Sequence, residues 1–336
     1  MSTVRVVEVV RETADAHTLV LESGDGTPLD YRPGQFLTLR VPSERPGGAA
    51  RCYSLCSSPH VDDKPAITVK RTRDGYASNW ICDHVIAGTE IEVLKPAGTF
   101  VPADLDQDLL LIAGGSGITP VLSILTSVLA AGTGRVHLVY ANRDEDSVIF
   151  AERLAGLARH HRGRLGVVHW LETVQGLPDA AALSTLLAPY AEREAFVCGP
   201  AAFMDLATEV LADLGAERVH VERFVSLEGD PFAEVEVPVA LDGEGAAHLE
   251  VTLDGTTTEL AWPVGGKLLD VMLAAGLAAP YSCREGNCSA CACVLLEGEV
   301  DLEHNQVLDA IDLADGLVLA CQARPRADRL RVSFDS

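Results

Sequence analysis

Four of the nine cysteines in this 336-residue chain lie within thirteen residues, in the segment YSCREGNCSACAC from Tyr281 to Cys293. Cysteines at such spacing form disulfides, bind zinc or bind an iron–sulfur cluster. The N-terminal stretch has no basic region followed by an apolar run, and no segment approaches about eighteen uncharged apolar residues. The sequence therefore predicts a cytoplasmic protein without a membrane span, and in that reducing compartment metal binding is favoured over a disulfide.

The spacing of the cysteines favours iron–sulfur chemistry. Cys283, Cys288 and Cys291 form a C-x4-C-x2-C pattern, and Cys321 follows in LVLACQARP. A plant-type [2Fe-2S] cluster takes three thiolates from one loop and a fourth from a distant strand end. Zinc sites usually combine two C-x2-C-like pairs, and this chain has one. We predict that these four cysteines hold a [2Fe-2S] cluster, and that Cys293 is a buried small residue of the next strand.

The flanks of the cysteine loop predict a small β-grasp domain. Alternating strand-like segments follow Val237, helical spacing appears in GGKLLDVMLAAGL, and RLRVSF closes the chain. Small or turn-tolerant residues separate the cysteines, so that the loop can direct backbone N–H groups toward cluster sulfurs. We assign residues 237–336 to this domain and residues 227–236, within VSLEGDPFAEVE, to a linker.

A second organised region begins at DLLLIAGGSGITPVLSILTSVLAAG. A buried strand gives way to a glycine turn and then to a helix with Pro120 in its first turn. Such a turn lets the backbone approach a phosphate, although many glycine turns merely connect elements. Alternating strands and helices follow up to AFVCGP, which predicts an open parallel sheet that binds a nucleotide at its carboxyl edge, in residues 105–226. The two breaks consist of Gly114, Gly115, Ser116 and Gly117, and of Cys198, Gly199 and Pro200.

The first hundred residues predict an antiparallel β-barrel, residues 1–104. Short alternating segments are separated by turn residues, with one helix expected at SNWICDHVIA. Within this region lie the segment RCYS, Lys70, and the segment DGYASNW at the helix start. The complete fold class is thus multi-domain: a barrel, an open parallel sheet and a β-grasp domain.

Composition supports a globular protein with several cores, since 48% of the residues are apolar and 22% are charged. The formal net charge of -23 excludes a nucleic-acid binder, because phosphates require a basic surface. A protein partner of this chain should carry positive charge.

Five motifs, RCYS, DGYASNWICD, AGGSGITP, VCGP and the cysteine loop, occur in the order found in the ferredoxin–NAD(P)H reductase superfamily. The chain resembles the oxygenase-reductase branch, which has a C-terminal plant-type ferredoxin, over essentially its whole length. RCYSLCSSP together with KRTRDGYASNW is similar to the reductase components of 3-ketosteroid 9α-hydroxylases. The similarity is looser to reductases of phenylacetyl-CoA epoxidase and of alkane or aromatic-ring oxygenases.

The resemblance implies roles for individual residues. In the barrel, Arg51 would neutralise a flavin phosphate, Tyr53 would lie on the isoalloxazine face and the Ser54 hydroxyl would reach the N5 side. The flavin would be FAD, because the helix start at Gly75 and Ser78 offers a place for a pyrophosphate that FMN lacks. Further cofactor-binding residues would be Lys70, the glycine turn with Thr119, Asn142, Arg143, Gly199 and Pro200, and Phe224 in place of a terminal aromatic over the flavin.

Cys198 would stand beside the nicotinamide, and with Tyr53 and Ser54 it completes the implied catalytic set. It would position groups and would not act as a nucleophile, because no histidine base lies near it in the sequence. NADH is expected to be preferred over NADPH, since Asp144, Glu145 and Asp146 would repel a 2′-phosphate that Arg143 alone would attract.

The implied function is electron transfer from NADH through FAD and the [2Fe-2S] cluster to a separate terminal oxygenase. A flavin accepts two electrons together and releases them singly, which the cluster requires. The favoured partner is a Rieske oxygenase of the 3-ketosteroid 9α-hydroxylase type, and another oxygenase system is the alternative. A redox-sensing interaction protein is less favoured, because three cofactor domains leave no output module. A monomer that docks its partner transiently is expected.

Overall fold

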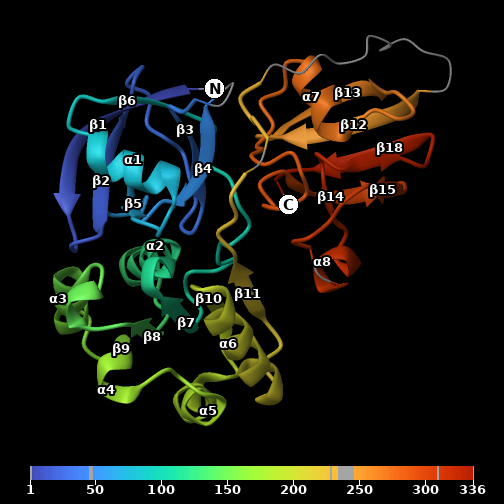
Figure 1. Ribbon diagram of the computed structural model, residues 1–336. Helices are drawn as coiled ribbons and strands as arrows, with labels where there is room; N and C mark the ends of the chain where they lie inside the picture. Colours follow the sequence, from blue (N-terminus) through green and yellow to red (C-terminus); the bar gives the residue numbers. More distant parts are fainter. Residues whose placement is uncertain (1, 45–47, 228, 234–245, 309, 336) are drawn as a thin grey trace.

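The computed structural model describes residues 2–44, 48–227, 229–233, 246–308 and 310–335. Each of the three regions expected from the sequence has its own sheet, and Figure 1 shows the barrel above the parallel sheet with the C-terminal sheet beside them.

The N-terminal sheet is an antiparallel, nearly closed barrel with the strand order β4-β3-β6-β1-β2-β5. A bridge between Leu55 and Ile67 brings its two end strands together. One side chain in two points inward, which gives a core of valine, leucine and isoleucine. The strands are β1 (Ser2–Arg11), β2 (Ala16–Ser23), β3 (Phe36–Val41), β4 (Ala49–Ser54), β5 (Ala66–Lys70) and β6 (Glu90–Val93), and the helix is α1 (Tyr76–His84).

The second sheet is fully parallel, in the order β11-β10-β7-β8-β9. Helices α2 and α3 cover one face, while α5 and α6 cover the other. Because both faces are covered, the central strand is apolar throughout. The elements are β7 (Leu109–Gly114), α2 (Ile118–Ala131), β8 (Val136–Asn142), α3 (Ala151–His160), β9 (Leu165–Leu171), α4 (Glu172–Gln175), α5 (Ala180–Leu187), β10 (Glu194–Cys198), α6 (Ala201–Asp213) and β11 (Val219–Glu222).

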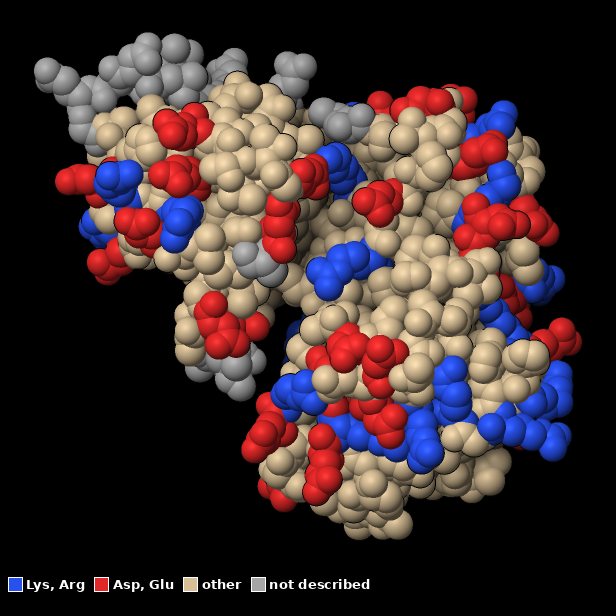
Figure 2. All heavy atoms as spheres, turned by 180° about the vertical axis from the view of Figure 1, so that it is seen from behind, with Lys and Arg blue, Asp and Glu red and all other residues tan. Residues whose placement is uncertain are grey.

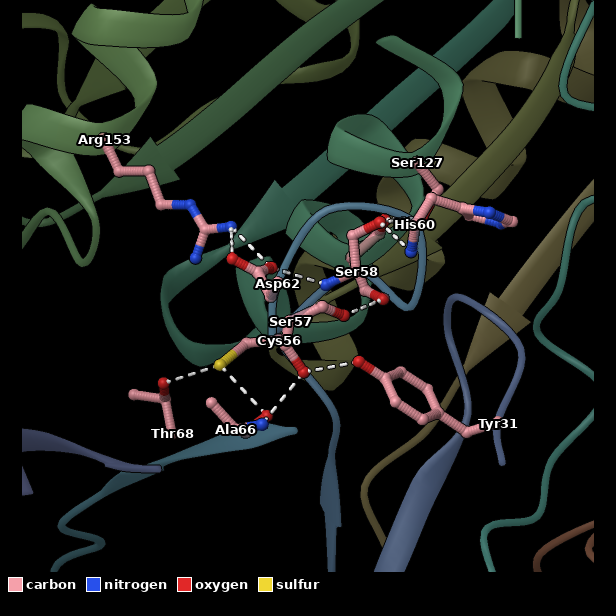
Figure 3. Close-up of polar contacts among 11 residues, drawn as sticks. Tyr31, Cys56, Ser57, Ser58, His60, Asp62, Ala66, Thr68, Ser127 and Arg153 are labelled. Carbon is pink, nitrogen blue, oxygen red and sulfur yellow. Dashed lines mark hydrogen bonds and ion pairs between the residues drawn. The ribbon is translucent and has the colours of Figure 1, made fainter. Parts of the chain in front are cut away.

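A polar joint fixes the barrel to the parallel sheet. Figure 3 shows Asp62, in the loop after β4, between the guanidinium of Arg153 on α3 and the backbone N–H of Ser58. The hydroxyls of Ser58 and Ser127 on α2 lie 2.8 Å apart. Helix α2 is buried on nearly all sides, since it packs against both units. Side chains contributed by the barrel and by the parallel sheet are therefore held in fixed relation.

The C-terminal sheet has the order β13-β12-β18-β14-β16, with a separate β15-β17 pair. β12 and β18 run parallel, as in a β-grasp domain, and α7 packs on the sheet around the buried Trp262. The elements are β12 (Ala247–Leu253), β13 (Thr256–Trp262), α7 (Leu268–Ala274), β14 (Ala292–Glu297), β15 (Val300–Leu302), α8 (Ala310–Ala314), β16 (Leu317–Leu319), β17 (Ala323–Pro325) and β18 (Arg329–Ser333).

Part of the expected linker can be followed. Leu227 and Phe232 are buried, and the guanidinium of Arg40 lies over the Phe232 ring. Residues 228 and 234–236, and the strand expected at VPVAL, lie outside the described residues. None of the helices in the described part combines the length and apolar character that crossing a lipid bilayer requires.

Candidate functional site

A cavity of about 270 Å³ lies where β4, β5 and α1 of the barrel meet the turn after β7 and the segment after β11. Two cationic side chains line it, and no carboxylate does so among the described residues. This charge suits a phosphate-bearing ligand. The cavity brings together nine of the residues expected from the sequence: Arg51, Tyr53, Ser54, Lys70, Gly75, Ser78, Ser116, Thr119 and Phe224.

Strand β4 presents the predicted flavin residues to this cavity. Arg51 donates to the carbonyl oxygens of Ala50 at 2.7 Å and of Leu227 at 3.3 Å, which fixes its guanidinium. Burial raises the pKa of the Tyr53 hydroxyl, so that this side chain is an uncharged aromatic surface. The buried Ser54 hydroxyl has no hydrogen-bond partner in the described part of the chain, and it is free to meet a ligand.

The start of α1 also faces the cavity. Gly75 occupies the N-cap position and no side chain caps the helix, so its first N–H groups stay available for an anion. A Cβ atom at Gly75 would lie 2.9 Å from Cβ of Thr72, which explains the glycine. The hydroxyl of Ser78 accepts from the backbone N–H of Thr72 at 3.1 Å and shapes this turn.

The glycines of the turn after β7 have two different structural roles. Gly115 has a φ of 52°, a left-handed conformation that glycine adopts readily, and a Cβ there would meet only the Lys70 ammonium, at 3.7 Å. Gly115 is thus the glycine of this turn that has free space beside its Cα atom. By contrast, a Cβ at Gly117 would lie 2.1 Å from the carbonyl oxygen of Cys198, and one at Gly114 would lie 2.8 Å from Pro200 Cδ. These two glycines let the turns after β7 and β10 pack together.

The remaining predicted nucleotide residues lie at the carboxyl edge of the parallel sheet. Asn142, the last residue of β8, is buried beside the Tyr140 hydroxyl, and neither atom of its side-chain amide has a hydrogen bond of normal geometry in the described part. An orphaned amide at this edge fits the hydrogen-bonding groups of a nucleotide. The neighbouring Arg143 is 64% exposed, with its guanidinium 3.7 Å from Asp15 Oδ2. Thr119 donates to the carbonyl oxygen of Ser116 at 3.1 Å.

Cys198 and Glu222 are paired neighbours on β10 and β11. Cys198 is fully buried, and this burial raises the pKa of its thiol well above its usual value. Such a thiol is a packing group and not a nucleophile. Burial also raises the pKa of the Glu222 carboxyl to about 8. Glu222 was not expected from the sequence, where it reads as one more surface acid of a strongly acidic chain.

Phe224 is 47% exposed and lines both the cavity and a small gap of about 10 Å³ behind it. The gap lies between the cavity and the cysteine loop, because Cys52 and Glu222 line it from one side and Cys288 lines it from the other. An aromatic ring is therefore present at the mouth of the cavity, at the position where one was expected to cover the flavin.

The four cysteines predicted as ligands come together in one group, because Cys283 hydrogen-bonds to Cys288 and Cys321, and Cys321 also hydrogen-bonds to Cys291. The backbone N–H of Cys283 donates to Sγ of Cys288 at 3.3 Å, and that of Cys321 donates to Sγ of Cys291 at 3.4 Å. Cys293 is buried in the core below the sheet, where burial raises the pKa of its thiol.

The loop backbone is shaped around these sulfur atoms. Arg284 and Ser289 have φ values of 59° and 50°, and such turns direct N–H groups inward. The N–H groups of Glu285 and Asn287 each lie 3.3 Å from Sγ of Cys283. The loop is thus suited to thiolates and to a negatively charged cluster.

The grouped thiols have the number of ligands that a two-iron cluster takes. A structural zinc gathers four ligands around one centre, whereas each iron of a [2Fe-2S] cluster takes two protein ligands. Four grouped cysteines supply two ligands for each iron.

The cysteine loop rests directly on the barrel. Thr38 on β3 donates to the hydroxyl of Ser282 at 2.7 Å, and Thr99 donates to that of Ser289 at 3.2 Å. Apolar contact accompanies these bonds, since Cys288 packs with Cys52 and Phe36. The cysteine site and the cavity on β4 therefore lie next to each other.

Several cavity residues escaped the sequence analysis: Cys52, Thr68, Thr72, Tyr76, Ala77, Val225 and Ser226. Each of them lies within two residues of a predicted one in the chain. Strand alternation could have singled out Thr68, which lies two residues before Lys70 and so shares its face. The others depend on how separate loops meet.

Three family models match the chain in the order of the three sheets. They are an oxidoreductase FAD-binding domain over residues 3–101, an oxidoreductase NAD-binding domain over residues 111–209 and a 2Fe-2S iron-sulfur cluster binding domain over residues 251–326. The order of these domains is the order of barrel, parallel sheet and cysteine-bearing sheet.

Curated relatives match over nearly the whole length. The 3-ketosteroid-9-alpha-monooxygenase ferredoxin reductase component of Mycolicibacterium smegmatis is 57% identical, covering 98% of this chain and 96% of the relative. The protein of the same name from Rhodococcus rhodochrous is 54% identical, with 98% and 95% covered. A component of the 1,2-phenylacetyl-CoA epoxidase of Escherichia coli is 34% identical, with 98% and 97% covered.

Two solved structures have the same fold as this chain. Full-length CYP116B46 from Tepidiphilus thermophilus superposes with a TM-score of 0.66 at 27% identity, covering 98% of this chain and 41% of that chain. Phthalate dioxygenase reductase shares the fold, with a TM-score of 0.58 at 24% identity and 99% and 97% covered. This chain therefore belongs to the ferredoxin–NAD(P)H reductase superfamily, in the branch of monooxygenase reductase components that join FAD-binding, NAD-binding and C-terminal 2Fe-2S domains.

Proposed function

We propose that this chain takes electrons from NADH and delivers them singly to a separate oxygenase that hydroxylates a 3-ketosteroid. The observation that carries the proposal is the contact between the cavity strand β4 and the cysteine loop, which joins the cavity to a four-cysteine site. The names of the relatives that are 54% and 57% identical supply the steroid substrate. A cytoplasmic location, where thiols stay reduced, and a monomeric reductase are part of this proposal.

On the nicotinamide side, the residues act by placement. FAD, when bound, would accept two electrons with a hydride and release them one at a time. Tyr53 would support one face of the ring and the unpartnered Ser54 hydroxyl would approach its edge. Arg51 and the free N–H groups of α1 would hold the phosphates. Thr119 and the paired turns after β7 and β10 would align the nicotinamide ring, with Gly115 and Asn142 beside the rest of the dinucleotide.

On the acceptor side, Cys283, Cys288, Cys291 and Cys321 would hold the cluster. The N–H groups of Glu285 and Asn287 would stabilise its negative charge by hydrogen bonds to sulfur. The docked loop places these cysteines against the barrel, where solvent has little access to three of them. The site thereby favours electron transfer within the chain.

The surface of the C-terminal domain fits a positively charged partner. From Val237 to Ser336 the sequence has sixteen Asp and Glu against six Lys and Arg, a net charge of -10. Five of the six basic residues already form ion pairs within the domain: Lys267, Arg284, Arg324, Arg326 and Arg329. Acidic side chains lie on this domain, with a few basic ones between them, on the face that Figure 2 shows. The surplus acids can steer a basic partner and release it quickly.

The test reconstitutes the pathway with purified oxygenases. The holoprotein and NADH should support 9α-hydroxylation of a 3-ketosteroid with the steroid oxygenase, and far less turnover with the oxygenase subunits of phenylacetyl-CoA epoxidase. Raising the salt concentration should slow transfer to the oxygenase, because screening limits the reach of charge to about 8 Å at physiological ionic strength. Reduction of a small neutral acceptor should change little. If the holoprotein supported equal turnover by both oxygenases, the proposed steroid substrate would be contradicted, whereas the reductase function would stand.

A further inference from the structure

Three side chains form a contact between the barrel and the cysteine loop, which we call the junction: Thr38 on β3, Cys52 on β4 and Ser282 before Cys283. The sulfur of Cys52 lies 3.3 Å from the Ser282 hydroxyl and 3.6 Å from the Thr38 hydroxyl. Thr38 donates to Ser282 at 2.7 Å. Both hydroxyl-bearing residues are 1% exposed, so water competes little for these bonds.

Cys52 is placed between the two cofactor sites. It follows Arg51 and precedes Tyr53 on the strand that lines the flavin cavity, and it lines that cavity itself. It also lines the small gap that Cys288 lines. Both cysteines pack against a buried cluster that contains Phe36. Cys52 therefore borders both the proposed flavin site and the surroundings of a proposed cluster ligand.

The environment makes Cys52 a filling group. Its sulfur lies beside the two hydroxyls of the junction and packs against the buried Phe36. A polarisable sulfur packs well against apolar neighbours and leaves little room for water. Removing it would open the space between the two sites or let the loop shift.

We infer that the junction couples the flavin site to the cluster: Cys52 fills the space between them, and the Thr38–Ser282 hydrogen bond holds the cysteine loop against β4. The inference rests on the proposed function and adds the residues that determine how fast its internal step runs. That step is the transfer of one electron, which the reduced flavin loses and the oxidised cluster gains. NADH is the source of the electrons, and no bond to Cys52 forms or breaks.

The test compares variants of the flavin- and cluster-loaded protein. Cys52→Ala removes the sulfur, Cys52→Ser keeps an atom in its place, and Thr38→Val removes the hydrogen bond to Ser282. Thr99→Val is the matched control, because it removes another hydrogen bond to the loop, at 3.2 Å from Ser289, outside the junction. Two steps are measured separately. Rapid mixing with NADH reports hydride transfer, and a laser flash with a deazaflavin donor places an electron on the flavin and reports cluster reduction.

We expect Cys52→Ala and Thr38→Val to slow cluster reduction at least about tenfold, since misplacing reacting groups by about 1 Å can cost a hundredfold. In Cys52→Ser and Thr99→Val, the rate of cluster reduction should stay within about threefold of the wild-type rate. This corresponds to a change of roughly 0.7 kcal/mol in the activation free energy of that step. The electron paramagnetic resonance spectrum of the cluster and its reduction potential should be unchanged in all four, and hydride transfer should be unchanged in Thr38→Val and Thr99→Val, which lie outside the cavity lining. Backbone amides of residues 283–291 should exchange with deuterium faster in Thr38→Val, which reports the loosened loop without any turnover.

Three results would overturn the inference. The first is wild-type cluster reduction in both Cys52→Ala and Thr38→Val. The second is an equal slowing in Thr99→Val, which would show that any loss of interface contact suffices. The third is a changed cluster potential or spectrum that accounts for the slower step. A wild-type protein whose cluster takes no electron from NADH would instead contradict the proposed function.

Discussion

Gly117 and Cys198 meet backbone to backbone, because a Cβ atom at Gly117 would lie 2.1 Å from the Cys198 carbonyl oxygen. Gly117→Ala should therefore separate the turns after β7 and β10, lower the free energy of unfolding by about 1–3 kcal/mol and raise KM for NADH. Gly156→Ala in α3 is the control, since its Cβ would meet nothing closer than 4.0 Å and should be neutral or stabilising. Urea unfolding and steady-state kinetics check both. Equal effects of the two substitutions would contradict the packing role of Gly117.

Replacing Cys321 with Ser should abolish the stable cluster, whereas Cys293→Ser should largely keep it. The backbone N–H of Cys321 lies 3.4 Å from the Cys291 sulfur, while Cys293 points into the core of the sheet. Iron analysis and the visible absorbance of the purified variants measure the difference. Flavin content should be the same in both and serves as the internal control. A variant pair with the opposite behaviour would show that the fourth ligand is Cys293.

NADH should be preferred over NADPH. The substitution Asp15→Asn should lower the ratio of kcat/KM for NADH to kcat/KM for NADPH. Asp15 lies 3.7 Å from the Arg143 guanidinium and offsets the charge that would attract a 2′-phosphate. Removing this partner should improve kcat/KM for NADPH roughly two- to fivefold, the range for an exposed ion pair. Asp25→Asn, in the turn after β2, is the control. An unchanged ratio of the two kcat/KM values in Asp15→Asn would mean that Arg143 does not reach the nucleotide.

Glu222 should make stability fall as pH rises. The folded pKa of its carboxyl is raised from 4.5 to about 8, so the folded state keeps a proton that the unfolded chain releases. The stability from this group is therefore complete below pH 4.5 and is lost as pH rises toward 8. Glu222→Gln, which cannot ionise, should show a flatter dependence of Tm on pH between about 5 and 8. The exposed Glu90→Gln should follow the wild type, and parallel curves for all three proteins would contradict the burial of an uncharged Glu222.

Local sequence patterns predicted much of the fold. The order of the three domains followed from strand alternation, from the apolar run before Gly114 and from the cysteine spacing, because each is a property of neighbouring residues. The glycine turn between a buried strand and a helix was also expected, and it lies between β7 and α2. Strand β4 was not expected as a strand, because its only apolar stretch, Ala49 and Ala50, is short and its remaining residues face the cavity.

Relationships between distant segments could not be predicted. Cys52 and Ser282 are 230 positions apart, so no local pattern connects them. The packing role of Gly117 depends on the turn after β10, and the raised pKa of Glu222 depends on burial beneath other segments. From the sequence alone, Cys52 is a small thiol, Gly117 is a phosphate-loop glycine and Glu222 is a surface acid. Their parts in the site arise only when segments that are distant in the sequence pack together.

The central claim is that electrons reach the oxygenase through the cluster. The most direct measurement is anaerobic rapid mixing of the reductase with NADH and the oxidised oxygenase, following flavin, cluster and oxygenase absorbance together. The wild type should show flavin reduction, then cluster reduction, then oxygenase reduction. Cys321→Ser should show flavin reduction at the wild-type rate and almost no oxygenase reduction. Oxygenase reduction at the wild-type rate by Cys321→Ser, in protein that contains no cluster, would contradict the account.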